Sequence, residues 1–226
     1  LPSRDRCGTP SWFRDTEGSG GAPFGVERGI RDPGKIFPTA EGARARPERR
    51  DEILADPALL DDWTNYQTAE DEPEITRELL EALVSRGRAK AYPTIEAACA
   101  ALGVPGVAVS RLGLISKSKP RGSTKHRLVW DLRRSLVNTV AHQGQRIVLA
   151  RLSDAVADTL SLLSEAIPTD LVLMCVFDIE DAFHSLTLAA CERKYQVACA
   201  AGQVFVFSAL IFGGSAGPTL RGRVAA

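Results

Sequence analysis

Residues 171–186 read LVLMCVFDIEDAFHSL, an almost wholly apolar run that leads into three carboxylates, Asp178, Glu180 and Asp181. The apolar run at 171–177 predicts a buried β-strand, with the acidic residues at the edge of its sheet. Clustered carboxylates repel one another unless a metal ion, a helix N-terminus or solvent surrounds them. Three interpretations are therefore open: a metal site, a cap for a following short helix, or plain solvent exposure.

Alternation of apolar and polar residues predicts two hairpins around this strand. The first joins strands at 112–116 and 127–132 through a polar loop that contains Pro and Gly. The second joins strands at 195–200 and 203–210. The sheet of this region is therefore expected to be mostly antiparallel.

Apolar residues at helical spacing predict three helices. One begins near Pro73 and ends at Gly87, a second covers 94–103, and a third covers 153–167 with Ser153 as its cap. The resulting order of elements, with the short helix expected after Asp178, predicts an α+β domain.

The net charge of zero conceals a separation of charge along the chain. Residues 51–81 hold eleven acidic residues and one base, whereas residues 111–151 hold ten bases and one acid. A basic segment of this kind is either a solvated face or a binding surface for a polyanion such as nucleic acid or a nucleotide phosphate.

Other features of the sequence narrow the protein class. Its apolar runs are shorter than the roughly 20 residues of a membrane span, and its N-terminus lacks an apolar signal core. The five cysteines show no C-x-x-C spacing, which argues against a zinc site and a disulfide framework. An intracellular protein, in cytoplasm or nucleus and without membrane contact, is expected.

Four segments, taken in order, resemble the reverse transcriptases of retroelements. They are KSKPRGSTKHRLVWDLRRSLVN (117–138), QRIVLARLSDAV (145–156), VFDIEDAFHSLTL (176–188) and FVFSALIFGGSAGPTL (205–220). The third is similar to the palm strand of that family, D-[IVL]-x-D-A-[FY], and the fourth to F-x-x-L-P-F-G-L-x-x-A-P. Ala150 and Ile211 stand where the family usually has proline. The resemblance covers about half the chain.

The resemblance implies a partial right-hand polymerase fold, with fingers and part of the palm at 111–226. An acidic helical region at 51–110 and a disordered Gly/Pro/Arg-rich arm at 1–50 are expected to precede it.

The resemblance also implies site residues. Asp178 is the implied catalytic carboxylate, and its side chain with the Ile179 carbonyl would hold Mg²⁺, or Mn²⁺ in its place. Arg127 would hold the triphosphate and Phe183 would exclude a 2′-hydroxyl, which predicts deoxynucleoside triphosphates as substrates. The implied nucleotide-binding residues are Lys119, Arg121, Arg127, Asp181, Ala182, Phe183, Phe212 and Gly213.

The most serious departure from the family concerns the second pair of palm carboxylates. The second carboxylate motif, Y-x-D-D, is absent. We therefore expect a fragment of a longer product that is inactive alone, although its family adds deoxynucleotides to a primer on an RNA or DNA template. The alternatives are a non-catalytic nucleic-acid-binding remnant of a retroelement and an unrelated α+β scaffold protein.

Overall fold

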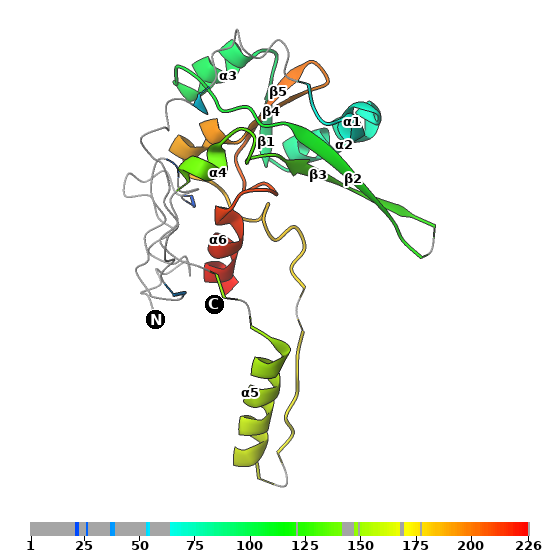
Figure 1. The fold of residues 1–226 in the computed structure, drawn as a ribbon, viewed down its shortest axis with the longest axis vertical. Coiled ribbons are helices and arrows are strands. Elements are labelled where there is room, and N and C mark those ends of the chain that lie inside the picture. Colours follow the sequence, from blue (N-terminus) through cyan, green and yellow to red (C-terminus); the bar gives the residue numbers. More distant parts are fainter. Residues whose placement is uncertain are drawn as a thin grey trace.

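The chain folds into a mixed α and β body with a long arm (Figure 1). The computed structural model describes residues 21–22, 26, 37–38, 53–54, 64–120, 122–141, 147–148, 150–167, 170–176 and 178–225. A three-stranded sheet has the order β1-β5-β4, a two-stranded sheet is formed by β2 and β3, and all pairings between these strands are antiparallel. The predicted α+β class is confirmed at this level.

The elements have the following bounds. The strands are β1 (Ala89–Tyr92), β2 (Leu112–Ser118), β3 (Thr124–Trp130), β4 (Val197–Ala200) and β5 (Gln203–Phe207). The helices are α1 (Gln67–Glu70), α2 (Pro73–Ser85), α3 (Ile95–Leu102), α4 (Val137–Val140), α5 (Leu152–Glu165) and α6 (Ala216–Ala225), with a 3₁₀ helix at Ala190–Tyr195.

Helix α2 begins and ends where its sequence predicts. Pro73 occupies the first turn, where its missing N–H is not needed. At the other end Gly87 has a φ of 68°, and its N–H donates to the Val84 carbonyl at 2.9 Å while the Arg88 N–H donates to the Leu83 carbonyl at 2.8 Å. This pair of bonds ends the helix in a left-handed turn that glycine adopts without strain.

The β4–β5 hairpin is confirmed, and the structure adds a partner strand that the sequence did not predict. Ala201 and Gly202 form the turn, with φ of 50° and 71°, as the twist of a two-residue hairpin requires. Strand β1 pairs with the other edge of β5, with Ala89 opposite Phe207. The described part of residues 51–110 thus shares a sheet with the C-terminal half of the chain.

Of the two clusters of buried apolar side chains among the described residues, the larger joins the two sheets. Its largest fully buried side chains include Trp130 from β3, Phe205 and Phe207 from β5, and Leu80 from α2. Trp130 and Phe207 meet edge to face with ring centroids 5.0 Å apart. Aromatic contacts of this geometry fix the two-stranded hairpin against the three-stranded sheet.

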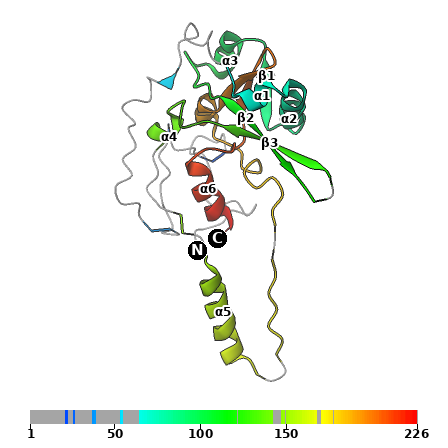
Figure 2. The same cartoon turned by 45° about the vertical axis from the view of Figure 1, so that its right-hand side comes forward.

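The predicted strand at 171–177 is wrong for its described residues. Residues 171–176 form no strand, and Leu171, Leu173 and Val176 are 79%, 71% and 89% exposed. They run beside the projecting helix α5 and back toward the body (Figure 2). Because none of the described strands pairs with this segment, its backbone and side chains stay open to solvent.

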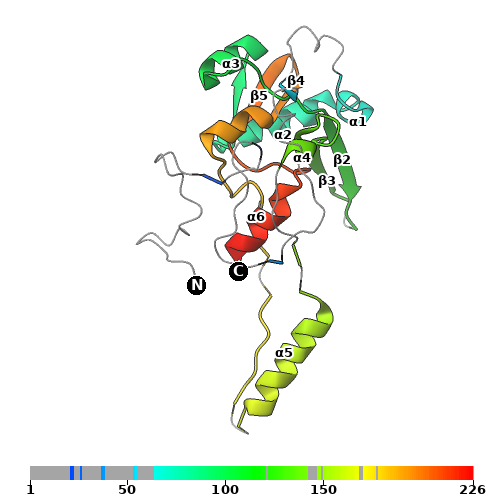
Figure 3. The ribbon, with the colours of Figure 1, turned by 60° about the vertical axis from the view of Figure 1, so that its left-hand side comes forward.

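Two further expectations about this arm and its end are corrected. Helix α5 is capped not by Ser153 but by Arg151 and Asp154, whose carboxylate accepts from the Arg151 backbone N–H at 2.8 Å. The short helix expected after Asp178 is a series of turns over residues 180–185. Helix α5 has no buried residue and stands apart from the body in every view (Figure 3).

None of the described helices has the length and apolar character that crossing a membrane requires.

Candidate functional site

The basic β2–β3 hairpin is anchored at its base and extends away from the body at its tip (Figures 1 and 2). Its base is held by the segment before α1, where the Leu112 N–H donates to Asn65 Oδ1 at 3.0 Å and the Tyr66 N–H donates to the Leu112 carbonyl at 2.9 Å. Lys119 is exposed near the tip, and Arg121 lies outside the described residues. The anchored base gives the side chains of β3 fixed positions.

Arg127 lies against the loop that precedes α6. Its guanidinium carbon is 5.7 Å from the centroid of the Phe212 ring, within the range of a cation–π contact. The side chain is exposed at the same time. Arg127 is therefore oriented by an aromatic ring while its guanidinium remains open to a ligand.

Phe212 in turn contacts two rings from the turn segment 180–185. Its centroid lies 5.1 Å from that of Phe183 and 5.5 Å from that of His184, both in edge-to-face geometry. Phe183 also packs on α6, since a Cβ built on Gly217 would lie 3.0 Å from its ring. Three separate segments thus meet in one cluster, which consists of Arg127, Phe183, His184 and Phe212.

The loop at 212–215 is held tightly on the end of β3. Gly213 has a φ of 105°, and a Cβ there would lie 2.2 Å from the Trp130 carbonyl oxygen. The Asn138 side chain donates to the Gly213 carbonyl and accepts from the Ser215 N–H, both at 2.9 Å. Only glycine fits at position 213, and the close approach it permits brings Phe212 to Arg127.

Asp181 and Ala182 lie in the same turn segment as Phe183. Asp181 has a φ of 49°, is exposed, and forms an ion pair with Arg86 at 2.8 Å. Ala182 is half-buried, and its carbonyl accepts from the Ser185 hydroxyl at 2.8 Å. The structure therefore places most of the expected nucleotide-binding residues on or beside one aromatic cluster.

The expected metal ligands do not form a complete site by themselves. Asp178 and Ile179 are both exposed. In the described ranges, no three His, Cys, Asp or Glu side chains lie together in a way that could hold a metal ion. Magnesium needs near-octahedral oxygen coordination, which one carboxylate and one carbonyl do not supply. The described residues alone do not complete such a coordination shell, and Mg²⁺ stays a prediction.

His184 is the most perturbed titratable group of the cluster. Burial lowers its pKa from 6.5, with Arg88 and Arg86 acting in the same direction and Asp181 in the opposite one. Its buried Nε2 has no hydrogen-bond partner among the described residues. The ring is therefore neutral near pH 7 and acts as part of the aromatic surface.

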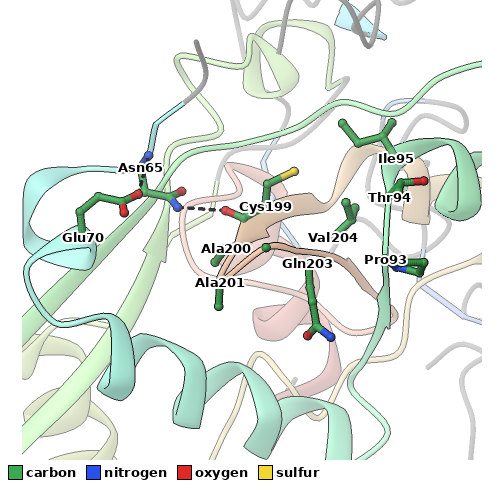
Figure 4. A pocket seen from close by; sticks show the side chains of 11 residues that line it. Asn65, Glu70, Pro93, Thr94, Ile95, Cys199, Ala200, Ala201, Gln203 and Val204 are labelled. Carbon is green, nitrogen blue, oxygen red and sulfur yellow. Dashed lines mark hydrogen bonds between the residues drawn. The ribbon is translucent and has the colours of Figure 1, made fainter. Parts of the chain in front are cut away.

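A hollow of about 360 Å³ lies elsewhere, between the β4–β5 turn and the segments that lead into α1 and α3 (Figure 4). None of the expected site residues lines it. Its one thiol, Cys199, is not activated, because burial raises its pKa to about 11. Asn65 at its rim donates to the Cys199 carbonyl at 2.9 Å, a contact that holds the turn in place.

A comparison with known protein families finds no family that matches this chain, and a comparison with curated proteins finds no match.

Sequence reasoning missed three residues that shape the cluster: Arg86, Asn138 and His184. Arg86 follows an acidic amphipathic helix, and no signal in the sequence places it beside Asp181, 95 positions later. Asn138 lies inside the hairpin motif, and His184 directly follows Phe183. For Asn138 and His184, a position within the resembling segments was the one signal in the sequence that could have pointed to the cluster.

Proposed function

We propose that this chain carries the nucleotide-binding part of an RNA-directed DNA polymerase of retrotransposon type. The observation that carries the proposal is the contact of Arg127 with Phe212 at 5.7 Å and of Phe212 with Phe183 at 5.1 Å. The resemblance implied nucleotide-binding roles for all three, and they come from three segments that are far apart in the sequence.

The chemistry of the cluster suits a nucleotide. The planar guanidinium of Arg127 can donate two parallel hydrogen bonds to phosphate oxygens. The rings of Phe183 and Phe212 offer apolar surfaces to a sugar and a base. In phosphoryl transfer the protein mainly positions the reactants and neutralises charge. These residues would position the incoming nucleotide and neutralise part of its phosphate charge.

The described residues do not supply the set of metal ligands that the chemical step of a polymerase needs. Asp178 has no carboxylate partners close enough to complete a metal site in the described part of the chain. We derive no chemical step through a metal ion. The proposal is that the chain binds and orients a deoxynucleotide and does not extend a primer by itself.

Binding of dTTP tests the nucleotide part of the proposal. We expect Arg127→Ala to weaken dTTP binding about tenfold, as loss of a charge-assisted contact does, and Arg127→Lys to restore it only in part. Arg133→Ala removes the same charge from an exposed site beyond β3 and should change the affinity less than about twofold. Absence of dTTP binding to the unmodified chain would refute the proposal.

Primer extension tests the catalytic part. With primer, RNA or DNA template, dNTPs and Mg²⁺ or Mn²⁺, the 226-residue chain is expected to add no nucleotides. Robust extension would show that the chain holds a complete catalytic site.

A second candidate, a non-catalytic nucleic-acid-binding protein, is favoured by a different observation. Lys117 and Lys125 lie directly opposite each other on β2 and β3, and both are exposed. Like charges in this register repel each other unless an anion lies between them. If the chain binds single-stranded RNA through these lysines, fails to bind dTTP and is indifferent to Arg127→Ala, the second candidate is correct.

A further inference from the structure

The end of α2 and Leu188, three residues beyond the turn segment 180–185, are joined through Ser208, the residue that follows β5. Its N–H donates to the Arg88 carbonyl at 2.9 Å, and its hydroxyl donates to the Gly87 carbonyl at 3.0 Å. On its other side, its carbonyl accepts from the Leu188 N–H at 2.8 Å. Two segments about a hundred positions apart in the sequence are therefore fixed to the same point.

This anchoring brings Arg86 to Asp181. The guanidinium Nη1 lies 2.8 Å from Asp181 Oδ2, and the two side chains are 60% and 48% exposed. An ion pair so exposed adds little to the stability of a fold. Its effect is instead on the charge that a ligand meets at the turn segment.

Asp181 is the unfavourable charge in a site for an anion. It lies three residues from His184, which contacts the Phe212 ring on which Arg127 rests. A free carboxylate beside residues 181–183 would repel a triphosphate. Arg86 offsets this charge, and Arg88, whose field reaches His184, adds a further positive charge nearby.

We propose that Arg86 is a positioning residue of the nucleotide site, which neutralises Asp181 so that the phosphates of a nucleotide can approach residues 181–183. The inference rests on the proposed function, because it presupposes that a nucleotide binds at residues 181–183. Arg86 itself lies outside the segments that resemble reverse transcriptases. It extends the site to the C-terminal end of α2.

The first test compares charge variants of the full chain by titration calorimetry with dTTP at low salt. Arg86→Ala is expected to weaken binding about fivefold, since it leaves Asp181 unpaired at a distance where water screens the charge only in part. Arg86→Lys keeps the charge and should lose less than about twofold. Arg77→Ala is the matched control, because Arg77 is an exposed arginine of the same helix, more than two turns away.

The double variant Arg86→Ala with Asp181→Asn separates neutralisation from a structural role. It removes both charges and keeps the backbone of residue 181, so it should bind dTTP more tightly than Arg86→Ala does and recover part of the lost affinity. Melting temperatures of all variants should agree within about 2 °C, as expected for an exposed ion pair. If the double variant binds as weakly as Arg86→Ala, the neutralising role is refuted.

Inorganic tripolyphosphate and thymidine separate this inference from the proposed function. The loss caused by Arg86→Ala should be similar for dTTP and tripolyphosphate and absent for thymidine, because it depends on phosphate charge. Binding of dTTP without any effect of Arg86→Ala overturns the inference and leaves the proposed function in place. Arg86-dependent binding of tripolyphosphate alone overturns only the nucleotide function, and no binding of either probe overturns both.

Discussion

Two apolar segments of this chain, QVFVF at 203–207 and LVLMCV at 171–176, have opposite environments. In the first, four of the five residues are buried, since β5 has β1 on one edge and β4 on the other. In the second, Leu173 and Met174 are 71% and 70% exposed, and no described strand lies beside them. Apolar composition is therefore not sufficient for a buried strand, because the backbone also needs partners for its N–H and C=O groups.

The largest expected difference between the two segments is in the cost of removing a large side chain. Phe205→Ala should lower the free energy of unfolding by about 4 kcal/mol, because Phe205 is 1% exposed within the core. Leu173→Ala should change it by less than about 0.5 kcal/mol. Urea denaturation of both variants measures the difference. An equal cost at both sites would mean that residues 171–176 are packed in solution.

Two glycines extend the comparison to the backbone: Gly213 is packed against another segment, whereas Gly202 has free space around it. Gly213→Ala should cost about 3 kcal/mol, because the new Cβ would lie 2.2 Å from the Trp130 carbonyl oxygen at a φ of 105°. Gly202→Ala should cost about 1 kcal/mol, since φ is 71° but no atom lies within 4 Å. Thermal or urea unfolding measures both. Equal costs would show that the loop at 212–215 is not held against β3.

The burial of His184 in the body predicts that the free energy of unfolding depends on pH. Burial lowers the pKa of His184 below its ordinary 6.5, so the unfolded chain takes up this proton first as the pH falls. The stabilising contribution is complete above pH 6.5 and is lost below it, by at most about 1.4 kcal/mol per pH unit. His184→Gln should flatten the profile of unfolding free energy just below the ordinary histidine pKa of about 6.5.

The control for this profile lies on the arm. Arg151 lowers the pKa of Asp154 from 3.8, so Asp154 titrates below the range in which His184 does. Asp154→Asn should therefore leave the slope of that profile unchanged. A slope that survives His184→Gln would assign the pH dependence to another group.

The smallest expected effect concerns two helix N-termini: that of α3, which Thr94 caps, and that of α5, for which the sequence predicted Ser153 as the cap. Thr94 accepts a hydrogen bond from the Ala97 N–H at 3.2 Å, so Thr94→Ala should cost about 1 kcal/mol. Ser153 is not the cap of α5, and Ser153→Ala should change stability by no more than about 0.3 kcal/mol. Circular dichroism during denaturation measures both. A cost at Ser153 as large as that at Thr94 would restore the cap that the sequence suggested.

Part of the candidate site followed from the sequence. Arg127, Phe183 and Phe212 were named from the resemblance, and the structure brings them into one cluster. Asp178 was named in the same way, yet it is exposed and has no co-ligands in the described ranges. Ligand sets depend on residues brought together from distant segments, which a pattern within one segment does not specify.

By itself, the sequence determined the features that depend on neighbours along the chain. Gly87 ends α2, Ala201 and Gly202 make the hairpin turn, and Thr94 caps α3, because each needs only the conformation or side chain of a few adjacent residues. Tertiary structure alone decided that β1 joins β5, that residues 171–176 stay exposed, and that Arg86 meets Asp181. These outcomes depend on which distant segment offers a backbone or a charge, and local propensity carries no information about that choice.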